Sequence, residues 1–208
     1  MDLSLATADI EAQARARAFA ETWLHPHEIA CDERTLSKKT LAEIKKNVLR
    51  YKLNGVNHTK ADGGHGYSPL QQILICEQLG RATNGMWTVC WKASTPLKYG
   101  TEKQRQEFLI PINQGKGRAC YAITEPRIEI AAHCLGAATR ATEIANDYAA
   151  GRIQFGKPIR DFQAIEFMLA DMAVELFATK SMIYRVGAEA RACCIFLSRP
   201  AFSSAPTR

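Results

Sequence analysis

One run of the sequence, RIQFGKPIRDFQ from Arg152 to Gln163, carries the side chains with the clearest chemical potential. A guanidinium such as that of Arg152 can hold a diphosphate through two parallel hydrogen bonds. Gly156 allows the chain to turn, and the Gln163 amide can both donate and accept a hydrogen bond. The run therefore indicates a site for a phosphate-bearing ligand; the alternative is an ordinary loop between two helices with a solvated arginine.

Two glycine clusters could also cradle a phosphate, but their spacing favours plain turns. Gly63-Gly64-His65-Gly66 precedes a predicted helix, and a helix N-terminus is a ready anion site. This cluster does not follow a clear strand and lacks the spacing of a nucleotide-binding fingerprint. Gly115-Lys116-Gly117 is likewise not a P-loop. Both segments are predicted to be turns.

The cysteines predict free thiols in a reducing compartment. Seven are present, an odd number, and most lie among apolar residues of predicted helices. The first residues, Met-Asp-Leu-Ser-Leu, do not resemble a secretory signal, so we expect a cytoplasmic protein. His25, His27 and Cys31 lie close together but lack a second ligand pair at a zinc-site spacing, so no metal is expected.

The composition is that of a soluble globular protein with a basic surface. Lysine and arginine total 27 against 21 acidic residues, which gives a net charge of +6. The basic residues are scattered through predicted helices and form no dense tract, which argues against nucleic-acid binding. No apolar run approaches the ~20 residues of a membrane span.

Apolar periodicity and capping residues predict an almost wholly helical chain. The predicted helices cover residues 7–24, 37–51, 69–81, 101–109, 127–150 and 162–191, with loops at 52–68, 111–117 and 151–161. The last helix spaces Ile165, Met168, Leu169, Met172 and Leu176 as one apolar stripe, and its short connector makes it antiparallel to 127–150. Residues 192–208 are predicted to be disordered.

Three motifs together resemble those of the acyl-CoA dehydrogenase family. They are RIQFGKPIRDFQ followed by FMLADMAVEL, the segment YAITEP, and EQLGRATNGMW with TPLKYGTEKQRQEFLIP. The resemblance covers nearly all of residues 1–191. It implies an all-α chain with an N-terminal helical domain at 1–126, part of the C-terminal helical bundle at 127–191, and an atypical tail at 192–208.

The resemblance also implies a flavin enzyme. Members of the family remove two hydrogens from an acyl-CoA to give the trans-2-enoyl-CoA. A carboxylate takes the α proton, FAD takes the β hydride, and the electrons then pass to an electron-transferring flavoprotein. The implied partners of this chain are therefore FAD, an acyl-CoA and that flavoprotein, and a homo-oligomer is possible.

Residues that match the family's motifs are the expected site residues. Those implied to lie along the flavin ring are Tyr121, Ile123 and Thr124. Those implied to reach the FAD diphosphate and adenosine of a neighbouring subunit are Arg152, Gln154 and Phe155, with Phe162 and Gln163 as a second contact. Arg127 matches an arginine near the bound acyl-CoA. For each residue the alternative is ordinary packing or a solvated side chain.

The chain departs from the family's pattern at two places. Glu125-Pro126 runs directly into Arg127, where a middle β-domain is expected, so that domain is predicted to be absent. The last two helices of the family's bundle are also expected to be missing. Pro126 stands where one branch of the family has its catalytic glutamate, and neither Glu125 nor Glu129 has the family position. No catalytic residue is therefore predicted.

These departures leave two functional hypotheses. In the first, the chain is an FAD-dependent member of the family. In the second, it is a catalytically silent helical protein that docks on full-length relatives through the face of residues 162–191. A hairpin without the rest of its bundle exposes an apolar stripe, and self-association is one way to cover it.

Overall fold

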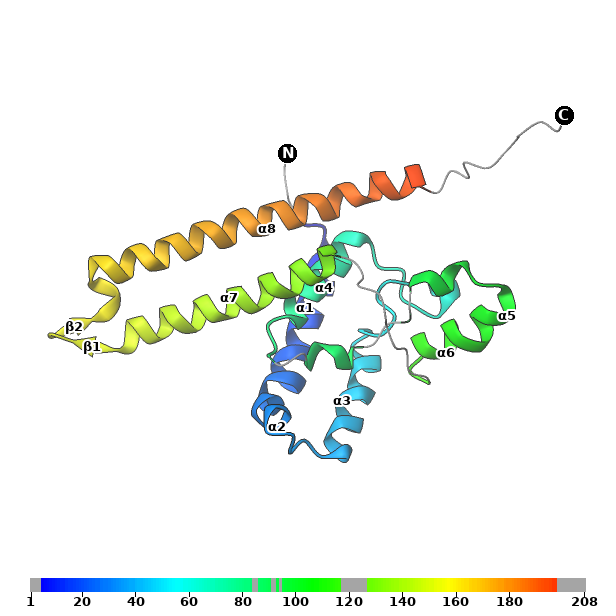
Figure 1. The fold of residues 1–208 in the computed structure, drawn as a ribbon, viewed down its shortest axis with the longest axis horizontal. Coiled ribbons are helices and arrows are strands. Elements are labelled where there is room, and N and C mark those ends of the chain that lie inside the picture. Colours follow the sequence, from blue (N-terminus) through cyan, green and yellow to red (C-terminus); the bar gives the residue numbers. More distant parts are fainter. Residues whose placement is uncertain (1–4, 84–85, 91–92, 94, 117–126, 198–208) are drawn as a thin grey trace.

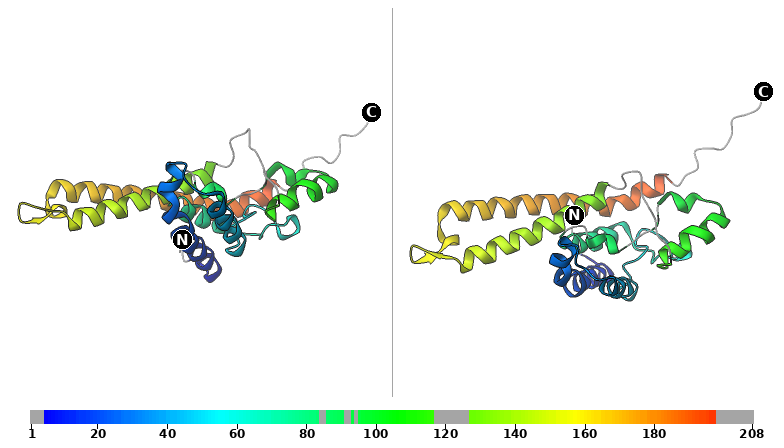
Figure 2. Two further views of the ribbon diagram at one scale, coloured as in Figure 1. Left: turned by 90° about the horizontal axis from the view of Figure 1, so that it is seen from below. Right: turned by 60° about the horizontal axis from the view of Figure 1, so that its bottom comes forward.

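The computed structural model describes residues 5–83, 86–90, 93, 95–116 and 127–197. The N-terminal part contains α1 (Thr7–Phe19), α2 (Glu28–Asp32), α3 (Lys38–Arg50), α4 (Pro69–Leu79), α5 (Glu102–Gln104) and α6 (Ile110–Asn113). The C-terminal part is a hairpin of α7 (Arg127–Gly151) and α8 (Gln163–Leu197), joined through β1 (Ile153–Gln154) and β2 (Lys157–Pro158). The hairpin projects far beyond the N-terminal helices (Figure 1), and two further views show the same extended arm (Figure 2).

The predicted all-α class is confirmed, because the sheet of the described chain is a single antiparallel pair of two-residue strands. Short 3-10 turns lie at Lys60–Asp62, Met86–Val89, Thr95–Tyr99 and Ile159–Asp161. No helix in the described ranges is long and apolar enough to cross a membrane. α4 begins as its sequence predicts: Ser68 accepts from the Gln71 amide in a capping box, and Pro69 takes the first helical position.

Two predicted boundaries are wrong. Pro111 was expected to begin a loop, but it lies in the first turn of α6, directly after a π-helical segment at Arg105–Leu109. The π-helical segment changes which backbone carbonyl each N–H group reaches. Proline is tolerated in the first turn of the following helix because a backbone N–H at that position would have no partner within the helix. α8 was expected to end near Arg191, but it continues to Leu197. Residues 188–197 contain no glycine or proline that would end the helix earlier.

The core consists of two clusters that meet at α4. The first joins α1 and α3 to α4 and includes Phe19, Leu24, Ile44, Val48 and Leu79, all at most 3% exposed. The second joins α4 to the hairpin, with Ile73 and Leu74 of α4 against Ala132 and Leu135 of α7 and Ile183 and Tyr184 of α8. α4 is therefore apolar on both sides, which explains why its sequence lacks a single hydrophobic face.

The α4–α7 crossing is a contact of backbone on backbone. A β-carbon added to Gly136 of α7 would overlap the carbonyl oxygen of Glu77, and one added to Gly80 would overlap that of His133. Gly187 of α8 similarly leaves room only for the side chain of Ile73. Glycine at these positions lets helices approach more closely than any larger residue permits.

Ion pairs flank this crossing. The Arg140 guanidinium of α7 donates to both carboxylate oxygens of Glu28 (2.6 and 2.9 Å) and to the carbonyl oxygen of Arg81 (2.7 Å). Arg81 pairs in turn with Glu143 (2.5 and 3.2 Å). Burial alone raises the pKa of the Glu28 carboxyl, but hydrogen bonds from Arg140 and the Thr83 amide outweigh it, so the pKa is lowered.

α8 is tied to the same helix through Glu77, which is 3% exposed. The Tyr184 hydroxyl donates to its carboxylate, and the Lys180 ammonium lies 3.5 Å away. Gln13 of α1 donates to both Glu77 (3.5 Å) and Tyr184 (3.3 Å). Burial and the neighbouring carboxylate raise the pKa of Tyr184, so its hydroxyl keeps its proton and remains a donor.

Gly136→Ala is expected to destabilise the protein by about 2 kcal/mol or more, because the added methyl group must push α7 away from α4. The measurement is the free energy of unfolding from urea denaturation followed by circular dichroism. Gly151→Ala is the matched control: it lies in the same helix and a β-carbon there meets nothing within 4 Å. The control is expected to stay within about 1 kcal/mol of the wild type; equal effects of both variants would contradict the close-crossing explanation.

Glu28→Gln is expected to cost about 2 kcal/mol at neutral pH, because it leaves the Arg140 guanidinium without its carboxylate. A carboxyl whose pKa is lowered by folding stabilises above its ordinary value of 4.5 and loses that stabilisation as the pH falls toward the folded-state value. The wild type should therefore lose more stability between pH ~5 and ~3 than the variant. Glu33→Gln, at an exposed position, serves as the control. If Glu28→Gln lost as much stability between pH ~5 and ~3 as the wild type, the Glu28 carboxylate would not be the source of this pH dependence.

Candidate functional site

The RIQFGKPIRDFQ run forms the far tip of the α7–α8 hairpin (Figure 1). Gln154 pairs with Lys157 across the two strands, and the Ile159 amide donates to the carbonyl oxygen of Arg152 at 2.8 Å. The turn between the strands consists of Phe155 and Gly156, with φ of 51° and 83°. Positive φ at both central residues is the geometry of a type I′ turn. The connector predicted at this place is therefore a tight β-hairpin.

Phe155 is an unusual residue for the first position of such a turn. A left-handed backbone costs a residue with a β-carbon about 1–2 kcal/mol, and Asn or Asp commonly takes this position. The phenyl ring is nevertheless 93% exposed. A large apolar side chain that is exposed at the tip of the hairpin is available for contact with another molecule.

A second aromatic ring, Phe162, is fixed beneath the turn. Its ring meets that of Phe155 edge to face, with centroids 6.2 Å apart and planes at 81°. The Lys157 ammonium lies 4.4 Å from the Phe162 centroid and donates to the carbonyl oxygen of Asp161 at 3.0 Å. Sequence reasoning missed Lys157; its signal was a cation directly after the Phe-Gly turn.

The tip brings together five of the predicted site residues. Arg152, Gln154, Phe155 and Gln163 are exposed, and Phe162 is half-buried. Arg152 makes no ion pair within the described chain, whereas Arg160 nearby lies 3.7 Å from Asp161. An unengaged guanidinium, two amides and an exposed ring fit the diphosphate and base of a dinucleotide such as FAD. These side chains lie together at the exposed tip of the hairpin (Figure 1).

The structure describes one further predicted site residue, Arg127, and not Tyr121, Ile123 or Thr124, which are outside the described residues. Arg127 begins α7, and Arg152 follows the last residue of that helix. With a rise of 1.5 Å per residue, the two backbone positions are about 37 Å apart, at opposite ends of α7.

The glycine-rich loop is a structural turn, as predicted. Gly63 and Gly66 have φ of 79° and 70°, and a β-carbon on Gly64 would overlap the carbonyl oxygen of His58. The fully buried Asn113 holds the loop in place, donating to the carbonyl oxygen of Asp62 at 2.9 Å. In the described part of the chain, no three His, Cys, Asp or Glu side chains form a group that could hold a metal ion.

Comparisons with known proteins match two family models to this chain. The acyl-CoA dehydrogenase N-terminal domain matches residues 8–116, and the acyl-CoA dehydrogenase C-terminal domain matches residues 113–196. The two matches meet, which leaves no stretch of the chain for a middle domain between them. This agrees with the observed architecture of N-terminal helices followed directly by the α7–α8 hairpin.

Individual relatives agree with the family models. The short-chain-specific acyl-CoA dehydrogenase of Megasphaera elsdenii is 38% identical over 156 residues, covering 65% of this chain and 40% of the relative. The caffeyl-CoA reductase–Etf complex subunit CarC of Acetobacterium woodii is 34% identical over 106 residues, covering 51% of this chain and 28% of the relative. This chain thus spans less than half the length of these relatives.

The fold also matches solved structures. The acyl-CoA dehydrogenase of Bacillus anthracis complexed with FAD aligns over 94% of this chain and 53% of its own, with a TM-score of 0.83 and 17% identity. That likeness establishes the fold. Because one family model alone matches more than half of the residues and a second matches most of the rest, the chain belongs to the acyl-CoA dehydrogenase family.

Proposed function

We propose that this chain is a flavoprotein subunit whose parent reaction is the FAD-dependent α,β-dehydrogenation of an acyl-CoA to the trans-2-enoyl-CoA. The family membership supports the reaction class. The single observation that carries the cofactor assignment is the hairpin tip, where Arg152, Gln154 and Phe155 are exposed on a rigid two-strand turn.

The roles of the tip residues follow from their chemistry. Arg152 would bind the diphosphate of FAD, since its guanidinium has no carboxylate partner within the described chain. Gln154 and Gln163 would donate to or accept from the polar groups of the nucleotide. Phe155 and Phe162 would contact its adenosine. The bound flavin would accept the hydride from the β carbon.

The cofactor at the tip is proposed to be held mainly by another subunit. The span of about 37 Å along α7 separates the tip from Arg127, which is proposed to lie near the acyl-CoA. Tyr121, Ile123 and Thr124 are proposed to contact the flavin ring. No residue of this chain is proposed as the catalytic base that would take the α proton.

The proposed electron acceptor is an electron-transferring flavoprotein. Support comes from the relative that is named as a subunit of a caffeyl-CoA reductase–Etf complex. Acyl chain length is not part of the proposal, because no described residue of this chain is assigned to an acyl-tail pocket.

A second candidate is a catalytically silent helical protein that binds full-length relatives. The observation that favours it is the exposure of large apolar side chains on α8, among them Met168 (61%), Val174 (67%) and Phe177 (75%). In a complete helical bundle such side chains are covered by neighbouring helices. A full-length relative could cover them.

An absorbance spectrum of the purified chain after incubation with FAD and desalting separates the two candidates. A retained flavin band that bleaches when acyl-CoA is added without oxygen is the result expected for the enzyme. A colourless chain that binds a purified full-length acyl-CoA dehydrogenase would support the silent helical protein. A colourless chain that does not bind the full-length relative would contradict both candidate functions.

Arg152→Ala is expected to weaken FAD binding by about 1.5–3 kcal/mol, because it removes a charge-assisted hydrogen bond to the diphosphate. The measurement is a fluorescence titration of FAD. Arg185→Ala makes the same charge change on α8, where that side chain is engaged with Glu189 at 2.9 Å, and should leave the affinity unchanged. Equal affinity of Arg152→Ala and wild type would remove Arg152 from the cofactor site.

A further inference from the structure

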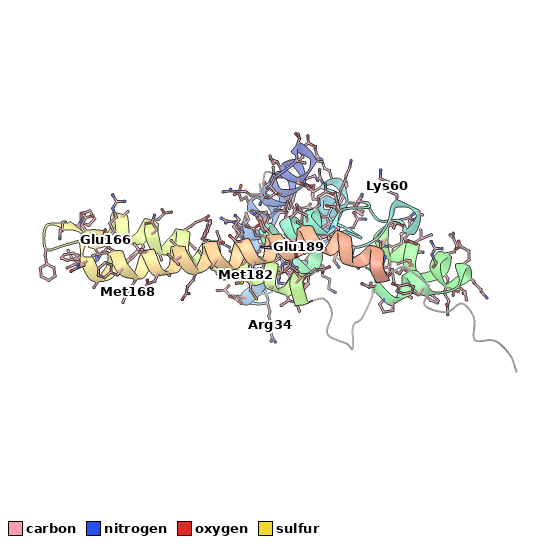
Figure 3. All side chains as sticks on the ribbon, turned by 90° about the horizontal axis from the view of Figure 1, so that it is seen from above. Arg34, Lys60, Glu166, Met168, Met182 and Glu189 are labelled. Carbon is pink, nitrogen blue, oxygen red and sulfur yellow. The ribbon has the colours of Figure 1, made fainter. Side chains whose placement is uncertain are left out.

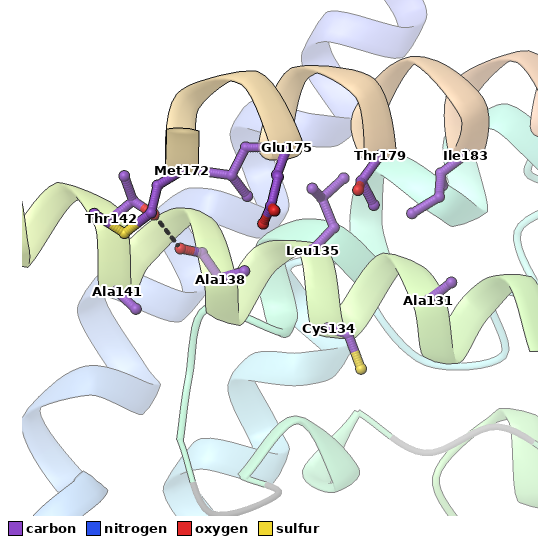
Figure 4. Close-up of a pocket in the computed structure, with 11 residues that line it drawn as sticks. Ala131, Cys134, Leu135, Ala138, Ala141, Thr142, Met172, Glu175, Thr179 and Ile183 are labelled. Atoms are coloured by element: carbon purple, nitrogen blue, oxygen red, sulfur yellow. Dashed lines mark hydrogen bonds between the residues drawn. The ribbon is translucent and has the colours of Figure 1, made fainter. Parts of the chain in front are cut away.

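An open apolar groove of about 480 Å³ runs between α7 and α8. Its walls include Cys134, Ala138 and Ala141 of α7 and Met172, Thr179 and Ile183 of α8 (Figure 4). Glu175 is the only charged side chain in the lining of this groove. The groove is thus an apolar surface that no described element of the chain covers.

Each helix presents a heptad stripe beside this groove, and all of its residues are exposed except the half-buried Met172. On α7 the stripe is Ile130, Cys134, Ala137, Ala141, Ile144 and Tyr148; on α8 it is Met168, Met172, Glu175, Thr179, Met182 and Val186. Spacings of four and three residues alternate in both, as in helices that pack side by side in a bundle. Met168 and Met182 project from α8 at two points along its length (Figure 3).

The two stripes complement each other in shape. The middle of the α7 stripe has only small side chains, Cys134, Ala137 and Ala141. The α8 stripe carries Met168, Met172 and Met182, whose flexible side chains fill irregular gaps. A protruding row on α8 can therefore lie over the shallow row on α7 of another copy, and the same contact repeats by two-fold symmetry.

The size of the face fits a stable dimer. Two helices about 9 Å apart that run together for about 35 Å present a face of roughly 600–700 Å². Specific, stable interfaces bury about 600–1,000 Å² on each partner, so this face lies at the lower end of that range. Two α7–α8 hairpins facing each other also make four antiparallel helices, the smallest common bundle that encloses an apolar core.

We propose that the groove face binds the same face of a second copy of this chain, so that two hairpins form one four-helix bundle. The inference does not depend on flavin binding. The near-neutral groove selects an equally apolar partner surface, and Glu175 is the one feature that opposes the contact, because burying an unpaired carboxylate is costly. The dimer is therefore expected to tighten when that charge is removed.

Sedimentation equilibrium of the full chain over a concentration series tests the proposal. The wild type should be a dimer, and Ala141→Glu, which places a charge on the α7 stripe, should raise the dimer dissociation constant at least about tenfold. Ala141 is exposed in the single chain, so the variant should keep its helicity by circular dichroism. Glu175→Gln should lower the dissociation constant severalfold.

Ala178→Glu is the matched control, since Ala178 is exposed on α8 outside both the stripe and the groove lining. It should leave the dimer unchanged. Three outcomes would overturn the proposal. They are a monomeric wild type, equal weakening by Ala178→Glu and Ala141→Glu, and a dimer that survives Ala141→Glu but is lost in Phe177→Glu, which lies on another apolar face of α8. A wild type that remains monomeric yet binds a full-length relative would assign the groove to that relative.

Discussion

The close crossing of α4 and α7 is the contact on which the rest of this structure depends. Gly136 packs against the backbone of Glu77, and Gly80 packs against the backbone of His133. The two helices therefore lie at a distance that only glycine at these two positions permits. That separation brings Arg140 within reach of Glu28 and Arg81 within reach of Glu143. Because side chains larger than glycine cannot enter the crossing, it acts as a fixed joint between the N-terminal helices and the hairpin.

Polar contacts set the direction of the hairpin arm around this joint. Glu77 bonds to Tyr184 of α8, while Arg140 of α7 bonds to Glu28, so both helices of the hairpin are held near their base. Buried carboxylates with cationic and hydroxyl partners are costly to separate, because each would leave an unpaired group. The arm extends beyond this base, and its far end carries the Arg152–Gln163 run (Figure 1).

This geometry separates two kinds of chemistry along one helix pair. The tip offers polar and aromatic groups suited to a nucleotide, with Phe155 held in a strained turn. The middle offers an apolar groove with one carboxylate, suited to another helix pair. Under the two proposals, a second molecule completes each of these surfaces.

Most of the helices, the turn in the glycine-rich loop and the family could be predicted from the sequence, whereas the role of the Arg152–Gln163 run stays a prediction. The helices and the turn depend on neighbours within a few residues, such as the Ser68–Gln71 capping box or the stripe from Ile165 to Leu176. The folded chain, and not its sequence, shows that Gly136 lies in a helix crossing, that Lys157 lies over Phe162, and that the stripes of α7 and α8 border one groove. Local periodicity shows that a face is apolar, but which partner covers it depends on contacts between residues far apart in the chain.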